Sequence, residues 1–317
     1  MTQIAALFAV FSLVMPSQRH RPAAKPASTP CGSPIAFQVL LDRQGFSPGE
    51  IDGTLGANLM HAIAALQAAR KLHPTGQADC ETWHALGGET AGAPTVAYTI
   101  AADDVKGPFE KVIPHDLDKQ ASLPAMSYRN PIEKLAERFH VSPALLQRMN
   151  PRAKFAAGEQ LQVPAVKPFD PDAKPASDPA AADVTIQVTK SDSSLRATRA
   201  DGSVVFFAPV TTGSEHDPLP AGDWKVTGVS WHPVFHYNPT LFWDAKPTQT
   251  SATIKAGPNN PVGVIWIDVN IPHYGLHGTP EPSRVGHTES HGCVRLTNWD
   301  AARLASLVKA GTPVLFR

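Results

Sequence analysis

One segment near the end of the chain combines a thiol with two imidazoles. His277 and Cys293 are sixteen positions apart, and His291 and Gly292 directly precede the cysteine. A nucleophilic cysteine needs a base that takes its proton and N–H donors that stabilise the oxyanion formed after attack. Because a free thiol has a pKa of about 8.5 and histidine one of about 6.5, an adjacent imidazole raises the thiolate fraction near neutral pH. The segment therefore contains the residue types that nucleophilic catalysis requires.

Two glycines beside these residues have a predicted positioning role. Gly292 lacks a Cβ, so a substrate carbonyl can come close to the backbone N–H groups at Cys293. The third member of a catalytic triad only has to fix the tautomer of the imidazole, and a backbone carbonyl is sufficient. Gly278 directly follows His277 and can supply this carbonyl.

The two blocks resemble the signature of a known family. His277-Gly278-Thr279, a spacer and Ser290-His291-Gly292-Cys293-Val294-Arg295 are similar to the signature of the L,D-transpeptidases, the YkuD or ErfK catalytic domain, which remodel bacterial peptidoglycan. The resemblance implies a β-sandwich catalytic domain that uses no cofactor and is acylated by carbapenem-type inhibitors. Three flanking segments extend it over most of residues 183–317: 257–263, 298–301 and 311–314.

The same resemblance implies roles for individual residues. Cys293 is the expected nucleophile, His277 its general base, and the Gly278 carbonyl the group that orients the base. His291 is expected to support the oxyanion or the substrate. Arg295 is expected either to contact a substrate carboxylate or to act as a structural anchor. Three further residues are expected to bind substrate: Ser290, Gly292 and Asn260.

A buried structural cysteine and a metal site are the alternatives. A lone cysteine is often a small buried hydrophobic residue, but this one lies between glycine-containing blocks and polar residues. Two His-x-x-x-His pairs would each converge on one face of a helix: His273 with His277, and His287 with His291. Pro272 and Gly275 interrupt the first pair, and the second does not read His-Glu-x-x-His. We therefore expect a reactive thiol and no metal.

The first fifteen residues contain no charged side chain. Their apolar run, residues 4–14, is too short to span a bilayer and suits a signal peptide, although no Lys or Arg precedes it. Residues 1–33 are expected to be a signal peptide and a proline-rich leader, which places the protein in the periplasm or cell envelope. In an oxidising compartment we expect Cys31 to pair with Cys80, which leaves Cys293 reduced.

The charge balance disfavours one class of partner. Lys and Arg total 28, as do Asp and Glu, so the formal net charge is zero. Proteins that bind nucleic acid usually carry a basic excess. The expected partner is peptidoglycan, through its stem peptides and its glycan strands.

Residues 34–90 are expected to form a small all-α domain of three helices, the third with Asp79 as its N-cap. A group of short motifs in this range resembles the peptidoglycan-binding domain family, and a generic helical adaptor is the alternative. The motifs are Asp52-Gly53-x-x-Gly56, Ala65-Leu66-Gln67, Thr75-Gly76 and Thr82-Trp83.

Residues 96–165 follow the order strand, helix, helix, strand. Ser142-Pro143 is a cap and first-turn pair for the second helix, and Asn150-Pro151 ends it. This α+β order resembles a LysM glycan-binding module. The stretch from Ile100 to Tyr128 is too long for the compact form of that module, which implies an insertion or an altered glycan groove.

Residues 166–182 are rich in Pro and Ala and predict a semi-rigid linker. Beyond it, residues 183–317 are predicted to form a mainly β domain, with period-two alternation at 184–188 and a hairpin over 195–209. One late helix is predicted after the N-cap Thr297.

The expected end of that late helix is Gly311.

Aromatic residues are concentrated at positions 231–243. They predict a packed flap or, alternatively, a lid that holds the peptide.

The favoured function is a cysteine L,D-transpeptidase that forms 3-3 cross-links between stems. The alternatives are an L,D-carboxypeptidase, a lipoprotein-anchoring variant of the same chemistry, a catalytically silent wall-binding protein and a metal-dependent peptidase. The sequence does not indicate which acceptor takes the acyl group.

Overall fold

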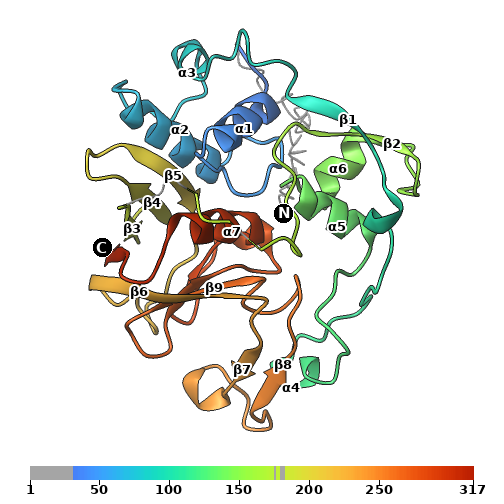
Figure 1. The fold of residues 1–317 in the computed structure, drawn as a ribbon, viewed down its shortest axis with the longest axis vertical. Helices are drawn as coiled ribbons and strands as arrows, with labels where there is room; N and C mark the ends of the chain where they lie inside the picture. The colour runs from blue at the N-terminus through green and yellow to red at the C-terminus, as the bar shows by residue number, and fades with distance from the viewer. Residues whose placement is uncertain (1–30, 175, 179–182) are drawn as a thin grey trace, which may run out of the picture.

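The computed structural model describes residues 31–174, 176–178 and 183–317 (Figure 1). The predicted signal peptide and the leader up to residue 30 lie outside the described residues. Within the described ranges, no helix combines the length and apolar composition needed to cross a bilayer. Three parts follow one another along the chain, which we name the helical unit (31–90), the βααβ module (95–164) and the catalytic domain (183–317).

The helical unit contains α1 (Pro34–Arg43), α2 (Ala57–Ala69) and α3 (Cys80–Ala85). Ser33 caps α1, where its side chain accepts a hydrogen bond from the N–H of Ala36. Asp79 is the N-cap of α3, as predicted, because its carboxylate accepts from the N–H of Thr82 at 2.8 Å. These caps satisfy N–H groups that a helix leaves without partners in its first turn.

The expected disulfide is present in the helical unit. Cys31 and Cys80 are bonded, with their Cα atoms 5.3 Å apart, and they are 49 positions apart in the sequence. Cys293 is a free cysteine. The hypothesis about cysteine pairing is therefore confirmed.

The βααβ module pairs β1 (Thr95–Thr99) with β2 (Gln160–Pro164) in antiparallel register, and α5 (Pro131–Arg138) and α6 (Pro143–Met149) lie between them in the chain. Its core buries side chains from α5, α6 and β2, with Tyr98 of β1 packed against it, and Leu146 and Val163 are 0% exposed. The order of elements is the predicted one. The assignment to LysM stays a prediction.

The long stretch after β1 is an insertion that contains η1 (Ala102–Asp104) and α4 (Leu117–Gln120). It packs against a two-stranded flap of the catalytic domain, β7 (Phe235–Tyr237) and β8 (Ala252–Ile254). Met126, Tyr237 and Ile254 are buried together at this contact. The insertion therefore supports the aromatic-rich segment that the sequence predicts as a flap or lid.

The catalytic domain is built on one mixed sheet of eight strands, in the order β11-β10-β9-β6-β12-β3-β4-β5. The strands are β3 (Thr185–Thr189), β4 (Ser194–Thr198), β5 (Val204–Pro209), β6 (Gly222–Trp231), β9 (Ile265–Val269), β10 (Gly275–His277), β11 (Val294–Arg295) and β12 (Pro313–Phe316). The predicted strand at 184–188 and the hairpin over 195–209 correspond to β3, β4 and β5.

Strand β6 links the two halves of this sheet. Its first positions pair with β12 and its later positions with β9, and the register shifts between Val226 and Gly228. A bulge of this kind bends a strand and increases its twist. The sheet therefore curls through β6, and the mainly β character of the domain is confirmed, while the β-sandwich arrangement stays a prediction.

Helix α7 (Asn298–Leu307) follows the cysteine block. Its N-cap is Thr297, whose hydroxyl accepts from the N–H of Asp300 at 3.1 Å, as the sequence predicts. The helix ends at Leu307 and not near Gly311, because the backbone of Val308 is already extended. Two 3-10 turns, η3 (Pro239–Leu241) and η4 (Pro282–Arg284), lie in loops of the same domain.

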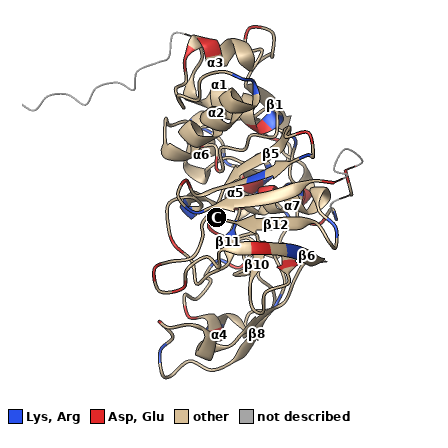
Figure 2. Ribbon diagram, turned by 90° about the vertical axis from the view of Figure 1, so that its left-hand side faces the viewer, with Lys and Arg blue, Asp and Glu red and all other residues tan. Residues whose placement is uncertain are grey.

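The three parts are packed together. Figure 2 shows the helical unit at one end, the curled sheet in the middle, and α4 with β8 at the other end. Phe207 of β5 is 0% exposed and belongs to the apolar core of the helical unit. Its backbone accepts from the N–H of Ser47 and donates to the carbonyl of Gly45, both at 2.8 Å. The helical unit is thus joined to the edge of the catalytic sheet.

Replacing Cys80 with Ser is expected to lower the free energy of unfolding by about 2–4 kcal/mol, because the disulfide closes a long loop and restricts the unfolded chain. Urea titration followed by circular dichroism measures this. Cys293→Ser, which removes a free thiol, is the matched control and should change the midpoint little. Equal midpoints for Cys80→Ser and the parent chain would contradict a stabilising role for the disulfide.

Candidate active site

The pairing of β10 with β11 brings the two sequence blocks together. The strands are parallel, with Leu276 opposite Val294 and His277 opposite Arg295. Leu276 and Val294 are 1% exposed and lie in the core. Because side chains alternate between the two faces of a sheet, His277 and Arg295 share the opposite face. Cys293 directly precedes β11, two positions before the residue opposite His277, and the charge of Arg295 acts on both His277 and Cys293.

His277 is held in one tautomer. Its Nδ1 lies 2.6 Å from the carbonyl oxygen of Gly278. Since a carbonyl oxygen can only accept, Nδ1 carries the hydrogen, and Nε2 is left as the proton acceptor. The ring is 3% exposed and stacks on the indole of Trp266 at a centroid distance of 5.3 Å. The orientation of the imidazole is therefore fixed on two sides.

Burial also sets the protonation state of His277. The pKa of the imidazole is lowered to about 3, mainly by burial and also by the charge of Arg295, while the hydrogen bond to Gly278 acts in the opposite direction. A charged imidazolium is disfavoured where water is excluded. His277 is therefore a neutral base throughout the ordinary pH range.

The thiol of Cys293 is partly buried, and its Sγ lies 3.6 Å from the carbonyl oxygen of His273. Burial raises the pKa of the Cys293 thiol, while the backbone of Gly275 and the charge of Arg295 lower it. Burial is the largest of these effects. The thiol of Cys293 and the imidazole of His277 therefore both rest in their neutral forms.

Ser290 and Gly292 shape the loop before Cys293. The hydroxyl of Ser290 donates to the carbonyl of Cys293 at 2.6 Å and accepts from the N–H of Gly292 at 3.2 Å. Gly292 has a φ of +108°, and a Cβ there would lie 2.6 Å from the ring of Tyr274. Only glycine fits this conformation and this close approach. Ser290 therefore organises the peptide groups around the thiol from a buried position.

His291 faces the flap. Its Nε2 lies 2.8 Å from a carboxylate oxygen of Asp244, and its ring contacts Phe242 at a centroid distance of 4.9 Å. Trp243 lies beside it, is 58% exposed and stacks on His216. The aromatic stretch thus has a packed part at Phe242 and an exposed part at Trp243. Both lie next to His291, two positions before Cys293.

Arg295 and Asn260 differ in their surroundings. Burial lowers the pKa of Arg295, and its charge acts on both Cys293 and His277. Asn260 is 0% exposed; its amide donates to the carbonyl of Lys255 at 2.8 Å, and its oxygen accepts from the N–H of Val262 at 2.9 Å. In this conformation Asn260 holds its own loop, and its expected contact with substrate stays a prediction.

Sequence reasoning did not single out four residues that shape this site: Trp266, Tyr274, Asp244 and Asn298. Asp244 lies beside the aromatic stretch that was noted, and Asn298 lies in the predicted helix start. Neither position carries a chemical signature of its own. Among the described residues, no group of three or more His, Cys, Asp or Glu side chains could hold a metal ion.

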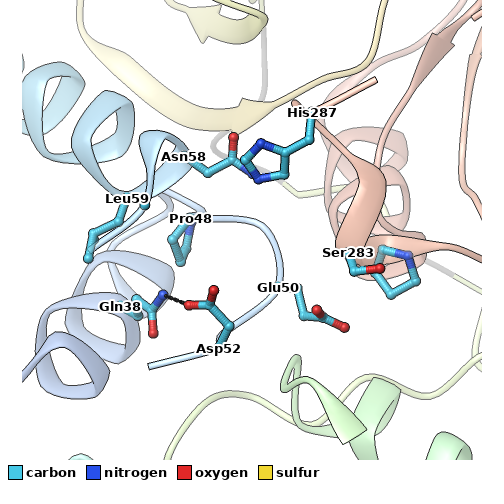
Figure 3. Close-up of a pocket in the computed structure, with 10 residues that line it drawn as sticks. Gln38, Pro48, Glu50, Asp52, Asn58, Leu59, Ser283 and His287 are labelled. Carbon is cyan, nitrogen blue, oxygen red and sulfur yellow. Dashed lines mark hydrogen bonds between the residues drawn. The ribbon is translucent and has the colours of Figure 1, made fainter. Parts of the chain in front are cut away.

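Two cavities lie away from the thiol. One, of about 50 Å³, separates the helical unit from the spacer between the two blocks (Figure 3). Glu50 and Asp52 face Ser283 and His287 across it, and burial, with the charge of Asp52, raises the pKa of Glu50 to about 7. The other, of about 840 Å³, lies between the helical unit, the segment 167–178 and α7. Neither is lined by Cys293 or His277.

Comparison with known proteins gives two family matches. Residues 183–315 match the L,D-transpeptidase catalytic domain, YkuD, and residues 33–86 match a family described as "Putative peptidoglycan binding domain". The first match contains every residue of the site described above.

Curated relatives carry the same description. "Putative L,D-transpeptidase YkuD" of Bacillus licheniformis is 27% identical over 186 residues, which cover 58% of this chain and 91% of that protein. "Probable L,D-transpeptidase YbiS" of Escherichia coli is 35% identical over 92 residues, which cover 29% of each protein.

Among solved structures, an L,D-transpeptidase from Mycobacterium smegmatis is 17% identical, with a TM-score of 0.35 and coverage of 51% of this chain and 64% of that one. A score this low adds no weight. On the family matches and the curated relatives, residues 183–315 are an L,D-transpeptidase catalytic domain, which makes the protein an enzyme of that kind, and residues 33–86 match a peptidoglycan-binding domain family.

Proposed function

We propose that the enzyme cleaves a tetrapeptide stem of peptidoglycan and transfers it to an amine. The Sγ of Cys293 attacks the carbonyl of the third residue, a diamino acid, while its proton passes to Nε2 of His277. The C–N bond to D-alanine then breaks, and His277 returns the proton to the leaving amine. A thioester on Cys293 remains.

In the second half of the reaction the side-chain amine of another stem attacks the thioester. His277 takes the proton of the amine, the C–S bond breaks, and the thiolate of Cys293 is protonated. The product is a 3-3 cross-link and the enzyme is restored. Transfer to water would instead make an L,D-carboxypeptidase, and transfer to a lipoprotein lysine would make an anchoring enzyme.

The observation that carries this proposal is the pairing of β10 with β11, in which Cys293 comes two positions before the partner of His277, with Nδ1 of the base bonded to the Gly278 carbonyl at 2.6 Å. An imidazole fixed in this tautomer presents the nitrogen that can accept the thiol proton. We assign supporting roles to His291, which helps to position the substrate, and to Arg295, which supplies positive charge in the substrate pocket. Ser290 and Gly292 shape the region that holds the oxyanion.

We further propose that the helical unit and the βααβ module bring the enzyme to the cell wall, where glycan strands and stem peptides are the partners. This function places the protein in the cell envelope, in the periplasm of a bacterium with an outer membrane. Carbapenem-type inhibitors are expected to acylate Cys293, because they present a strained carbonyl to a thiol that has its base beside it.

Replacing Cys293 with Ala is expected to abolish release of D-alanine from tetrapeptide muropeptides. His277→Gln should slow it about 100-fold or more, because general-base catalysis of this kind contributes 10²–10⁴-fold. Mass spectrometry of the products measures release, the bond formed and the acceptor together. His287→Gln, a histidine of the spacer outside β10, is the control and should keep activity. D-alanine release that survives in Cys293→Ala would refute the assignment.

The pH dependence follows from the lowered pKa of His277. Since the folded-state pKa is about 3, the base stays neutral as pH falls through 6.5, the ordinary value for histidine. The second-order rate constant for carbapenem acylation should therefore show no acid limb near pH 6.5 and should fall only toward pH 3. Stopped-flow absorbance between pH 4.5 and 8 tests this. A tenfold loss of rate per pH unit below 6.5 would contradict it.

A further inference from the structure

Asn298, the first residue of α7, has its carboxamide buried between the catalytic domain and the βααβ module. The side chain is 0% exposed. Its Oδ1 accepts from the N–H of Val264 at 3.2 Å. Its Nδ2 donates to the carbonyl of Pro258 at 3.1 Å and to the carboxylate of Glu137 at 2.7 Å. Each polar atom of this amide therefore has a partner.

The same carboxamide fills space that two glycines leave open. A Cβ on Gly263 would lie 2.0 Å from Oδ1 of Asn298, and a Cβ on Gly278 would lie 2.1 Å from it. The oxygen is thus packed directly against the backbone of Gly278. That residue presents its carbonyl to Nδ1 of His277. The position of Oδ1 consequently limits the positions that the Gly278 peptide group can take.

Glu137 fixes which way the carboxamide points. It comes from α5 of the βααβ module and is 8% exposed. One of its oxygens accepts from Asn298, and the other accepts from the hydroxyl of Tyr128. If the amide of Asn298 were flipped, its oxygen would face a carboxylate oxygen, and two acceptors would be opposed. The acid therefore selects the orientation in which Oδ1 faces the glycines.

The surrounding contact holds the two modules in place. The N–H of Asn259 donates to the carbonyl of Met126 at 2.9 Å, and its side chain donates to the carbonyl of Ser127 at 2.8 Å. Gly257 is packed against the same backbone, since a Cβ there would lie 2.3 Å from the oxygen of Met126. Glu137 thus meets Asn298 across a fixed interface.

We propose that Glu137 and Asn298 are a positioning pair for the general base. The carboxylate from the βααβ module orients the carboxamide, and the carboxamide holds the Gly278 peptide that keeps His277 in its Nδ1–H tautomer. Neither residue touches the thiol, so both act through Gly278. The inference rests on the proposed role of His277 as the base, and it makes the βααβ module a part of the catalytic apparatus.

The test uses the full chain and four variants. Glu137→Leu removes the acceptor and keeps the volume, and Asn298→Ala removes the amide. Glu137→Gln keeps an oxygen for Asn298 and offers its NH₂ group to Tyr128. Glu133→Gln is the matched control, because Glu133 lies on the same helix and accepts from Asn259 but not from Asn298.

Two readouts are needed: the maximal rate constant for acylation of Cys293 by a carbapenem, and the ¹⁵N shifts of the His277 ring, which report its tautomer. In Glu137→Leu and Asn298→Ala we expect acylation to slow about 10- to 100-fold, as misplacement of a catalytic group does, with inhibitor affinity unchanged. The ring signals should move toward a mixture of tautomers. Glu137→Gln and Glu133→Gln should resemble the parent chain. A fifth variant that combines Glu137→Leu with Asn298→Ala should be no slower than the slower of these two single variants.

Several results would overturn the proposal. Acylation of Cys293 at the parent rate in Glu137→Leu would do so. A slower acylation would also do so if the variant has lost thermal stability and His277 keeps its tautomer. If Glu137→Leu does not fold, Asn298→Ala decides by the same criteria. Full acylation in His277→Gln would refute the proposed function itself. A tautomer shift in Glu137→Leu would still be seen in that case, so the two failures are distinguishable.

Discussion

The parallel pairing of β10 with β11 is the contact on which the whole site depends. It consists of two residue pairs only, and its stability comes from Leu276 and Val294, which are buried in the core beneath it. A slip of one residue would exchange the two faces and drive His277 into the apolar layer. The short ladder is kept in register by β9 on its other side and by the hydrogen bond from the N–H of Leu296 to the carbonyl of His277.

Exclusion of water gives this site its electrostatic character. Burial raises the pKa of the Cys293 thiol and lowers that of His277 to about 3, so both groups rest in their neutral forms. The charge of Arg295 favours the thiolate and disfavours the imidazolium. In the mechanism that we propose, the ion pair therefore forms only along the reaction path, and a partly buried cation is already in place to stabilise negative charge on sulfur or oxygen.

The first turn of α7 joins the three parts of the chain. Asn298 bonds to Glu137 of the βααβ module, and Asp300 accepts from Ser47 of the helical unit at 2.9 Å. Trp299 stacks on His140 at a centroid distance of 5.0 Å. Burial raises the pKa values of Glu137 and Asp300 to about 7, so these contacts resemble the interior of one protein more than a surface between independent domains. The helical unit and the βααβ module, which we propose bind the cell wall, are thus packed around α7, the helix that follows Cys293.

Local signals in the sequence determined the signature blocks, the caps at Asp79 and Thr297 and the order of most strands, because each depends on residues close together in the chain. The disulfide could also be predicted from the sequence, since the chain contains only three cysteines. Tertiary structure alone decided that the sheet is continuous through β6, that Asn260 is buried in its own loop, that the insertion after Ile100 supports the flap, and that Glu137 meets Asn298, 161 positions away. These features result from packing between distant segments of the chain. Neither hydrophobic periodicity nor the spacing of motifs indicates which distant side chains pack against each other.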